Sequence, residues 1–186
     1  MGEIGNILYP IISEIGKEKI QSDIALDIGL SRQHIQMILA QCEKRIEDAS
    51  DKSIGSLCEA LLHFMLTTCT LPSVRKVRID NIDIDIVIPN LHTLRKFPDK
   101  AIVIQISKDA KSIIKDQLKN VIKIQPKVKN LWVVSKKLIL ADYLNYIVES
   151  ENNALPSLLK RNFQDIILDI DTFLEQTKDT SFRFFR

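Results

Sequence analysis

The sequence predicts a mixed α/β protein, and three observations support this fold class. Residues 82–90 and 101–109 alternate apolar and polar side chains with the period of two that is typical of strands. Residues 53–69 form a long apolar run that suits a buried helix. Residues 112–125 repeat apolar residues at helical spacing. Together they predict an αβββαβ core with a mixed central sheet over residues 53–149.

Residues 1–49 are predicted to form a small all-α unit in which a tight turn joins two helices. The small and apolar positions that would set the two helices are Ile24, Ala25, Ile28, Ile35 and Ile38. Gly29 tolerates a positive φ in the turn, and Ser31 is a good cap for the second helix. These positions resemble the helix-turn-helix pattern of DNA-binding proteins.

The second helix of this unit would supply the contacts to DNA. Its exposed face presents side chains that can bond base edges or phosphates, namely Arg32, Gln33, His34 and Gln36. Packing between helices without DNA binding is the alternative explanation of the same pattern.

The segment VRKVRI, the pair Asp80–Asn81 and the segment IDIDIVIP predict a β-hairpin. Counting by two places four isoleucines on one side of its second strand: Ile82, Ile84, Ile86 and Ile88. Asp83 and Asp85 fall on the other side. A third strand, AIVIQIS, places Gln105 and Ser107 on one face, so pairing of the strands would gather Asp85, Gln105 and Ser107 on a common surface.

Further along the chain, the helix SIIKDQLKNVIKIQ is followed by a strand NLWVVS and a helix that reaches residue 149. The apolar face of the first of these helices would consist of Ile113, Ile114, Leu118, Val121 and Ile124. Residues 150–186 are predicted to be a helical extension, formed by two amphipathic helices or one bent helix. Its apolar side would consist of Leu155, Leu159, Phe163, Ile166, Ile167, Ile170 and Phe173. We expect it to complete the core, with a dimer contact as the alternative.

Composition excludes several classes of protein. The chain has 186 residues, 45% hydrophobic and 27% charged, and a net charge of +2. No run of 18 apolar residues occurs, and no basic segment followed by an apolar one opens the chain, so we expect a cytoplasmic protein without a membrane span. The three cysteines, Cys42, Cys58 and Cys69, lack CxxC spacing, which favours reduced thiols over disulfides or structural zinc.

Glu59 is the only formally charged residue between Lys52 and Arg75, and it lies on the predicted buried helix. A buried carboxylate without a partner costs several kcal/mol, so we expect a cation, a metal or a proton beside it. The alternatives are a carboxylate that reaches solvent, or a bond to His63 one turn away.

These residues, in this order, resemble the PD-(D/E)xK nuclease superfamily, which includes Holliday-junction resolvases and many type II restriction endonucleases. The resemblance covers about residues 53–149 and implies an endonuclease that cuts double-stranded DNA with Mg²⁺ or Mn²⁺. It implies that Glu59 is the acid of the helix and Asp85 the central metal-binding aspartate, with Asp83 as a secondary acid. Gln105 and Ser107 occupy the positions of the third-motif acid and lysine.

The chain departs from the motif at these last two positions. Gln105 can coordinate a cation through its carbonyl oxygen but adds no charge, and Ser107 provides no cation. The expected metal ligands are therefore Glu59, Asp85 and Gln105. Lys108 is the first candidate to replace the missing lysine, although strand alternation directs it to the other face unless a bulge intervenes. Lys111 and Lys115, at the start of the following helix, are the alternatives.

Basic residues follow the same region. One helical stripe contains Lys108, Lys111, Lys115, Lys119 and Lys123, and one strand carries Arg75, Lys76 and Arg78. We expect Lys111 and Lys115 to contact the DNA backbone, and we expect a homodimer, because cutting both strands of a symmetric site usually needs two copies. The alternative function is that of a DNA-binding or regulatory protein built on a degenerate nuclease fold.

Overall fold

The computed structural model describes residues 3–109, 111–138, 140, 142–149 and 159–182, and for 111, 112 and 179–182 the backbone alone. Its centre is a six-stranded sheet whose strands lie side by side in sequence order. The strands are β1 (Val74–Ile79), β2 (Ile82–Ile88), β3 (Ile102–Ile106), β4 (Leu131–Ser135), β5 (Leu144–Ile147) and β6 (Lys160–Asn162). Both pairings among β1, β2 and β3 are antiparallel, and the pairings from β3 to β6 are parallel. The sheet is therefore mixed, as predicted.

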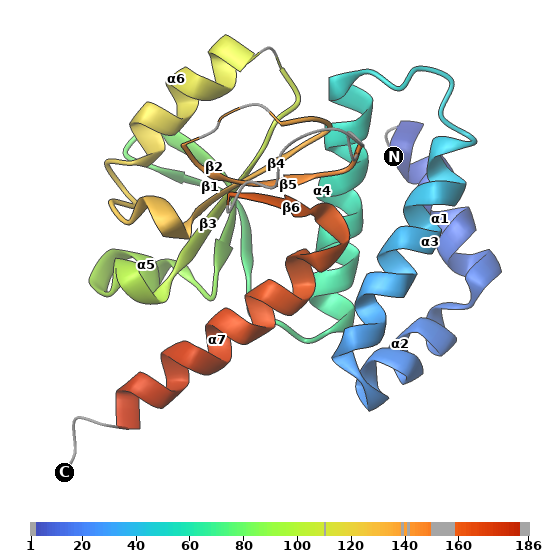
Figure 1. Cartoon of the computed structure of the whole chain (residues 1–186), viewed down its shortest axis with the longest axis horizontal. Coiled ribbons are helices and arrows are strands. Elements are labelled where there is room, and N and C mark those ends of the chain that lie inside the picture. The colour runs from blue at the N-terminus through green and yellow to red at the C-terminus, as the bar shows by residue number, and fades with distance from the viewer. Residues whose placement is uncertain (1–2, 110, 139, 141, 150–158, 183–186) are drawn as a thin grey trace.

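Helices cover both faces of the sheet (Figure 1). Helix α4 (Asp51–Thr68) packs on one face, and α5 (Leu91–Lys96) and α6 (Lys111–Val121) lie on the other. Short 3-10 turns precede β3 at Pro98–Lys100 and β4 at Val128–Asn130. In the described part of the chain, no helix is long and apolar enough to span a membrane.

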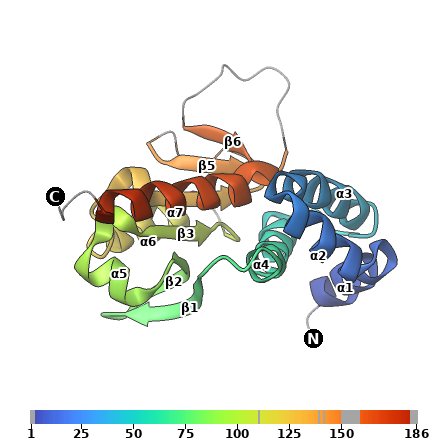
Figure 2. The same cartoon turned by 90° about the horizontal axis from the view of Figure 1, so that it is seen from below.

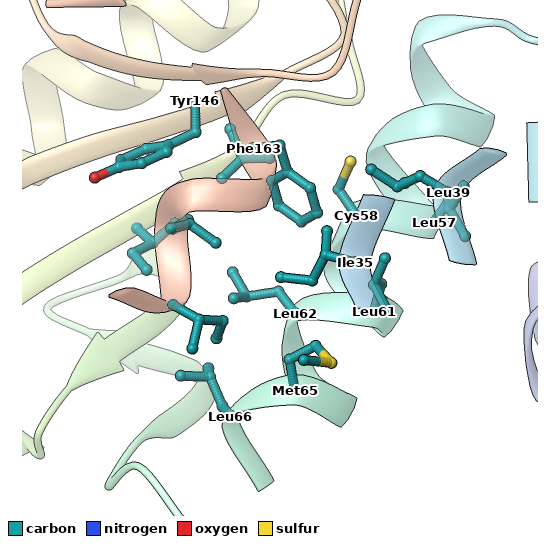
Figure 3. Close-up of a cluster of buried hydrophobic side chains, with 14 of the residues drawn as sticks. Ile35, Leu39, Leu57, Cys58, Leu61, Leu62, Met65, Leu66, Tyr146 and Phe163 are labelled. Carbon is teal, nitrogen blue, oxygen red and sulfur yellow. The ribbon is translucent and has the colours of Figure 1, made fainter. Parts of the chain in front are cut away.

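The N-terminal helices lie on the far side of α4 from the sheet (Figures 1 and 2). They are α1 (Glu3–Ile15), α2 (Lys17–Leu26), the 3-10 turn η1 (Ile28–Leu30) and α3 (Ser31–Glu43). Figure 3 shows Ile35 and Leu39 of α3 packing beside α4 and Phe163. One continuous apolar core thus joins α1–α3 to α4, while the division at residue 49 remains a prediction.

The two helices predicted for residues 21–40 are present, but the turn between them differs from the expectation. Asp27 caps the turn, because its carboxylate accepts a hydrogen bond from the backbone N–H of Gly29 at 2.7 Å. Ser31 is the first residue of α3, and its buried hydroxyl has no hydrogen-bond partner. Ala25 is exposed and Gly29 does not adopt a positive φ. The predicted roles of Ala25, Gly29 and Ser31 are therefore wrong.

The β1–β2 hairpin forms at the predicted turn. Asp80 and Asn81 have φ values of 49° and 62°, the left-handed conformation that a two-residue type I′ turn requires at both central positions. The predicted common side of the four isoleucines is wrong, because Ile82 and Ile84 pack with α6 in one core whereas Ile86 and Ile88 pack with α4 in the other. Strand β2 therefore changes faces at Asp85.

The C-terminal third departs furthest from the prediction. Strand β5 replaces the helix predicted to end at residue 149, and β6 lies within the predicted helical extension. A turn at Phe163–Asp165 (η4) leads into α7 (Ile166–Phe182), whose residues Ile166, Ile167 and Ile170 complete the core as expected. Leu155 lies outside the described residues. On α6, Ile113 is 48% exposed rather than buried.

Candidate active site

The candidate site lies where β2 and β3 separate. Backbone pairing of the two strands ends at Ile86–Ile104, and side chains bridge the strands beyond that point. The Gln105 amide accepts a hydrogen bond from the Asp85 N–H at 3.0 Å and donates one to the Asp83 carbonyl at 2.9 Å. Asp85 Oδ2 in turn accepts from the Ile106 N–H at 2.8 Å. Gln105 of β3 thus bonds the backbone of β2, and Asp85 of β2 bonds the backbone just after Gln105 in β3, so the two side chains join the strands.

Glu59 is buried on α4 and is surrounded by cations, one of the partners that its sequence context predicts. Lys108 Nζ bonds its Oε2 atom, Lys76 Nζ lies 3.2 Å from Oε1, and an Arg75 nitrogen lies 3.5 Å from Oε1. Burial works against ionisation of Glu59, but the bonds from Lys108 and Lys76 outweigh it and hold the pKa of the carboxyl below its ordinary value. Glu59 is therefore an anion in the free protein.

Lys108 reaches the site because β3 ends at Ile106, so strand alternation no longer governs its direction. Helix α4 also approaches this strand end closely. A Cβ atom built on Gly55 would lie 2.5 Å from the Ser107 carbonyl oxygen and 2.9 Å from Lys108 Cγ. Only glycine fits at this position, one helical turn from Glu59. Gly55 thus allows the ammonium of Lys108 to meet the Glu59 carboxylate.

We expect Gly55→Ala to destabilise the protein by about 2 kcal/mol, because the obstructing atom is backbone and cannot rotate away. Displacement of the backbone at Ser107 and Lys108 should also weaken the contact between Lys108 and Glu59. Urea unfolding measures the first effect. The control is Ser56→Ala on the same helix, at a half-buried position, and it should change stability by less than about 0.5 kcal/mol. Equal stability of the two variants would contradict the close approach.

Asp85 is a partly buried carboxylate near the same lysines. Burial raises the pKa of the Asp85 carboxyl above its ordinary value, although the Ile106 N–H and the charge of Lys108 oppose the rise. A polar hollow opens over Asp85, Gln105 and Lys108 and is bordered by Asn81, Gln117 and Asn120. Oδ2 of Asp85 accepts a hydrogen bond from the backbone, and no residue that the structure describes forms a hydrogen bond with Oδ1.

The other residues of the predicted motif lie at the margin of the site. The Asp83 side chain is 83% exposed and lies 3.6 Å from the Arg78 guanidinium. The Ser107 side chain is buried, and its hydroxyl donates to the Asp109 carbonyl at 3.4 Å. The hydroxyl therefore bonds within the turn after β3. The expected common surface contains Asp85 and Gln105, but the Ser107 hydroxyl is not available on it.

The arrangement fits a divalent cation only in part. Across the residues that the structure describes, no group of three or more His, Cys, Asp or Glu residues is placed to hold a metal ion. Within the described part of the chain, Oδ1 of Asp85 has no hydrogen-bond partner and Asp85 lines a polar hollow, which suits Mg²⁺ or Mn²⁺. Glu59 is occupied by three cations, and the Gln105 carbonyl already accepts one hydrogen bond. Each of these two would have to exchange or share a partner to bind the ion.

The residues predicted to meet DNA fall into two groups. Gln33 and Gln36 are exposed on α3, and Arg32 is 51% exposed and lies 3.0 Å from Asp165. His34 is an exception, because its side chain is 8% exposed and its Nε2 atom lies 3.0 Å from Asp23. The expectation that His34 lies on the exposed face is therefore wrong. It links α3 to α2 instead.

Helix α6 borders the hollow through Gln117 and Asn120. Lys115 is exposed on this helix. Lys111 is its first residue, and the Lys111 side chain lies outside the described part.

Sequence reasoning missed the role of Gly55, and it placed Lys76 only among the general basic residues. The one signal for Gly55 was a glycine inside a helical pattern, which often marks a close packing contact.

Solved structures show which fold this arrangement belongs to. The restriction endonuclease PspGI in complex with substrate DNA matches with a TM-score of 0.60 and 15% identity, covering 95% of this chain and 94% of that chain. Metal-depleted Ecl18kI in complex with uncleaved, modified DNA matches with a TM-score of 0.59 and 10% identity, covering 95% and 80%. The chain has a restriction-endonuclease-like fold. No protein-family model and no curated protein matches its sequence.

Proposed function

We propose that the protein is a metal-dependent DNA endonuclease of the type II restriction kind. The observation that carries the proposal is the convergence of Asp85, Glu59 and Lys108 where β2 and β3 separate. Two carboxylates can hold a divalent cation, and an ammonium group can bind the phosphate. Both suit hydrolysis of a phosphodiester, because the phosphate gains negative charge during the reaction and positive charges stabilise it.

The roles of the residues follow from their contacts. Asp85 would hold Mg²⁺ or Mn²⁺ through Oδ1, with Glu59 and the Gln105 carbonyl as further ligands. The bound ion would supply a Lewis acid for the phosphate. Lys108, which pairs with Glu59 in the free protein, would bind a non-bridging phosphate oxygen and orient water. Asp83, at the rim, would assist.

The charge around Glu59 supports a polyanionic substrate. Arg75, Lys76 and Lys108 contribute three positive charges, against two negative charges from Glu59 and Asp85. The three cations at Glu59 are groups that a phosphate can bind. The structures of PspGI and Ecl18kI are complexes with DNA, which supports double-stranded DNA as the partner. A homodimer would cut both strands.

Cleavage assays test the proposal directly. The purified protein is incubated with plasmid and with varied duplexes in Mg²⁺, in Mn²⁺ and in EDTA. We expect discrete DNA fragments with either metal and none with EDTA. Sedimentation of the protein with and without a duplex measures the oligomeric state. Intact DNA under every metal condition would refute the enzymatic proposal.

The DNA contacts give a second prediction. Combined replacement of Arg32, Gln33 and Gln36 by Ala should abolish preference among sequences, because these side chains would read base edges. Replacing Lys111 and Lys115 should weaken binding to all sequences and reduce the salt slope by about 0.9 per lost phosphate contact. Titrations of labelled duplexes at several salt concentrations measure both. Equal losses on every sequence for both sets would contradict the assignment.

One observation favours the second candidate, a DNA-binding or regulatory protein that has lost the chemistry. Both ends of the Gln105 amide are engaged with the β2 backbone, and Ser107 is buried where the motif has its lysine. Under this reading the protein binds DNA without cutting it. Sequence-selective binding together with intact DNA in every metal would establish this function instead.

A further inference from the structure

Lys76 has a backbone conformation that an ordinary strand residue does not adopt. The pairs Arg75–Ile86 and Val77–Ile84 flank it, which places Lys76 opposite Asp85 in the hairpin. Its φ value is 48°, in the left-handed region that L-residues other than glycine rarely enter. The strained residue therefore lies in the middle of a strand and beside the central carboxylate of the candidate site.

The conformation changes where the Lys76 side chain points. Consecutive strand residues normally face opposite sides of a sheet. Here Arg75 and Lys76 both reach Glu59, with nitrogen–oxygen distances of 3.5 Å and 3.2 Å. Strand β2 changes faces at Asp85, the position opposite. The left-handed conformation of Lys76 thus directs its ammonium to the Glu59 carboxylate.

Folding stability does not explain this strain. The Lys76 side chain is 67% exposed, so solvent weakens its ion pair with the buried Glu59. Glu59 has two further cationic partners, Arg75 and Lys108. Backbone strain that the local contacts do not offset is concentrated at functional sites, where it orients a reacting group.

We infer that Lys76 is a catalytic lysine whose ammonium binds a non-bridging oxygen of the phosphate at Asp85. The inference rests on the proposed nuclease function. Lys76 is the more accessible of the two lysines at Glu59, since its side chain is 67% exposed against 29% for Lys108. The negative charge on the phosphate oxygens grows as water adds to phosphorus, and the ammonium stabilises that charge without transferring a proton.

Three variants at one position test the inference. Lys76→Ala should lower the cleavage rate about 100-fold or more, and Lys76→Arg should restore part of it. Lys76→Gly should lose the same activity but unfold about 3 °C higher than Lys76→Ala, because only glycine adopts the positive φ without strain. Lys129→Ala is the control, since Lys129 is exposed before β4 at the opposite end of the sheet.

Cleavage by Lys76→Ala within threefold of the wild type would overturn the inference. Equal unfolding temperatures of the Gly and Ala variants would remove its argument from strain and overturn it as well. Wild type that cuts nothing refutes the nuclease proposal separately. The contact is then judged by metal-free DNA binding, where Lys76→Ala should reduce the salt slope by about 0.9 and Lys129→Ala should leave it unchanged. An unchanged slope for Lys76→Ala, or no binding by the wild type, refutes the phosphate contact.

Discussion

Asp85→Asn is expected to reduce cleavage of DNA by about 10³-fold or more while the protein stays folded. Asparagine keeps an oxygen that can accept the hydrogen bond from the Ile106 N–H, so the bridge between β2 and β3 survives. It lacks the negative charge that would bind the divalent cation. DNA binding in metal-free buffer should be unchanged or tighter, because a negative charge near the phosphate is removed.

The pH dependence of stability provides an independent measurement of the same substitution. Burial raises the folded-state pKa of Asp85 above its unfolded value, so the folded state binds the proton more tightly. Stability from this group is therefore present below the unfolded pKa and is lost as the pH rises through the folded pKa. Asp85→Asn should remove that loss and be at least as stable as the wild type at pH 7, with a difference within about 1 kcal/mol.

Asp83→Asn is the matched control. The same chemical change is made two residues away, at a side chain that is 83% exposed, and it should reduce cleavage far less than Asp85→Asn. Urea unfolding from pH 4 to pH 8 and fragment release in Mg²⁺ measure both variants. Active Asp85→Asn enzyme, or equal losses from both substitutions, would remove Asp85 from the centre of the site.

The sequence was sufficient for the part of the fold whose periodicity is strong. Helix α4, the β1–β2 hairpin, β3, α6 and β4 occur in the predicted order, because their apolar residues recur at the spacing of the element. Strands β5 and β6 were missed because they have four and three residues, too few to show alternation. Their structure depends on parallel pairing that starts from β4, which is a tertiary effect.

The candidate site was located from sequence, but its internal contacts were not. Alternation placed Asp85 and Gln105 together, and the isolated charge of Glu59 indicated a partner. That Lys108 supplies this partner depends on where β3 ends and on the space left by Gly55. The hydrogen bonds of Gln105 depend on the point at which β2 and β3 separate, and a one-dimensional pattern does not encode that point.

Gln105→Glu is expected to change both stability and metal binding strongly. The variant tests whether Gln105 joins β2 to β3 or binds the metal. The amide N–H₂ of Gln105 now donates to the Asp83 carbonyl at 2.9 Å. A carboxylate would place an acceptor against that carbonyl, so the variant should lose about 2 kcal/mol of stability at pH 7. Protonation converts the new side chain into a donor and restores the bond. Its folded-state pKa should therefore be raised.

The sign of the pH dependence follows from that shift. Stability of Gln105→Glu should approach that of the wild type below the unfolded pKa of glutamate, about 4.3, and fall as the pH rises through the higher folded pKa. Urea unfolding at pH 4 and pH 7.5 measures the difference. Gln117→Glu, which adds the same charge at an exposed position lining the hollow, should show no comparable loss. Wild-type stability of Gln105→Glu at pH 7.5 would show that the bridge has no energetic role.

Manganese then decides whether the three groups converge on an ion. If Glu59, Asp85 and the new carboxylate bind one Mn²⁺, calorimetry should show tighter uptake by Gln105→Glu than by the wild type. Mn²⁺ at about 100 times its dissociation constant should also stabilise the variant by about 2.7 kcal/mol, enough to offset the expected loss. Gln117→Glu should gain no such affinity. Without Mn²⁺ uptake by either the wild type or Gln105→Glu, the polar ends of β2 and β3 are not a metal site, and the proposal of a metal-dependent nuclease fails.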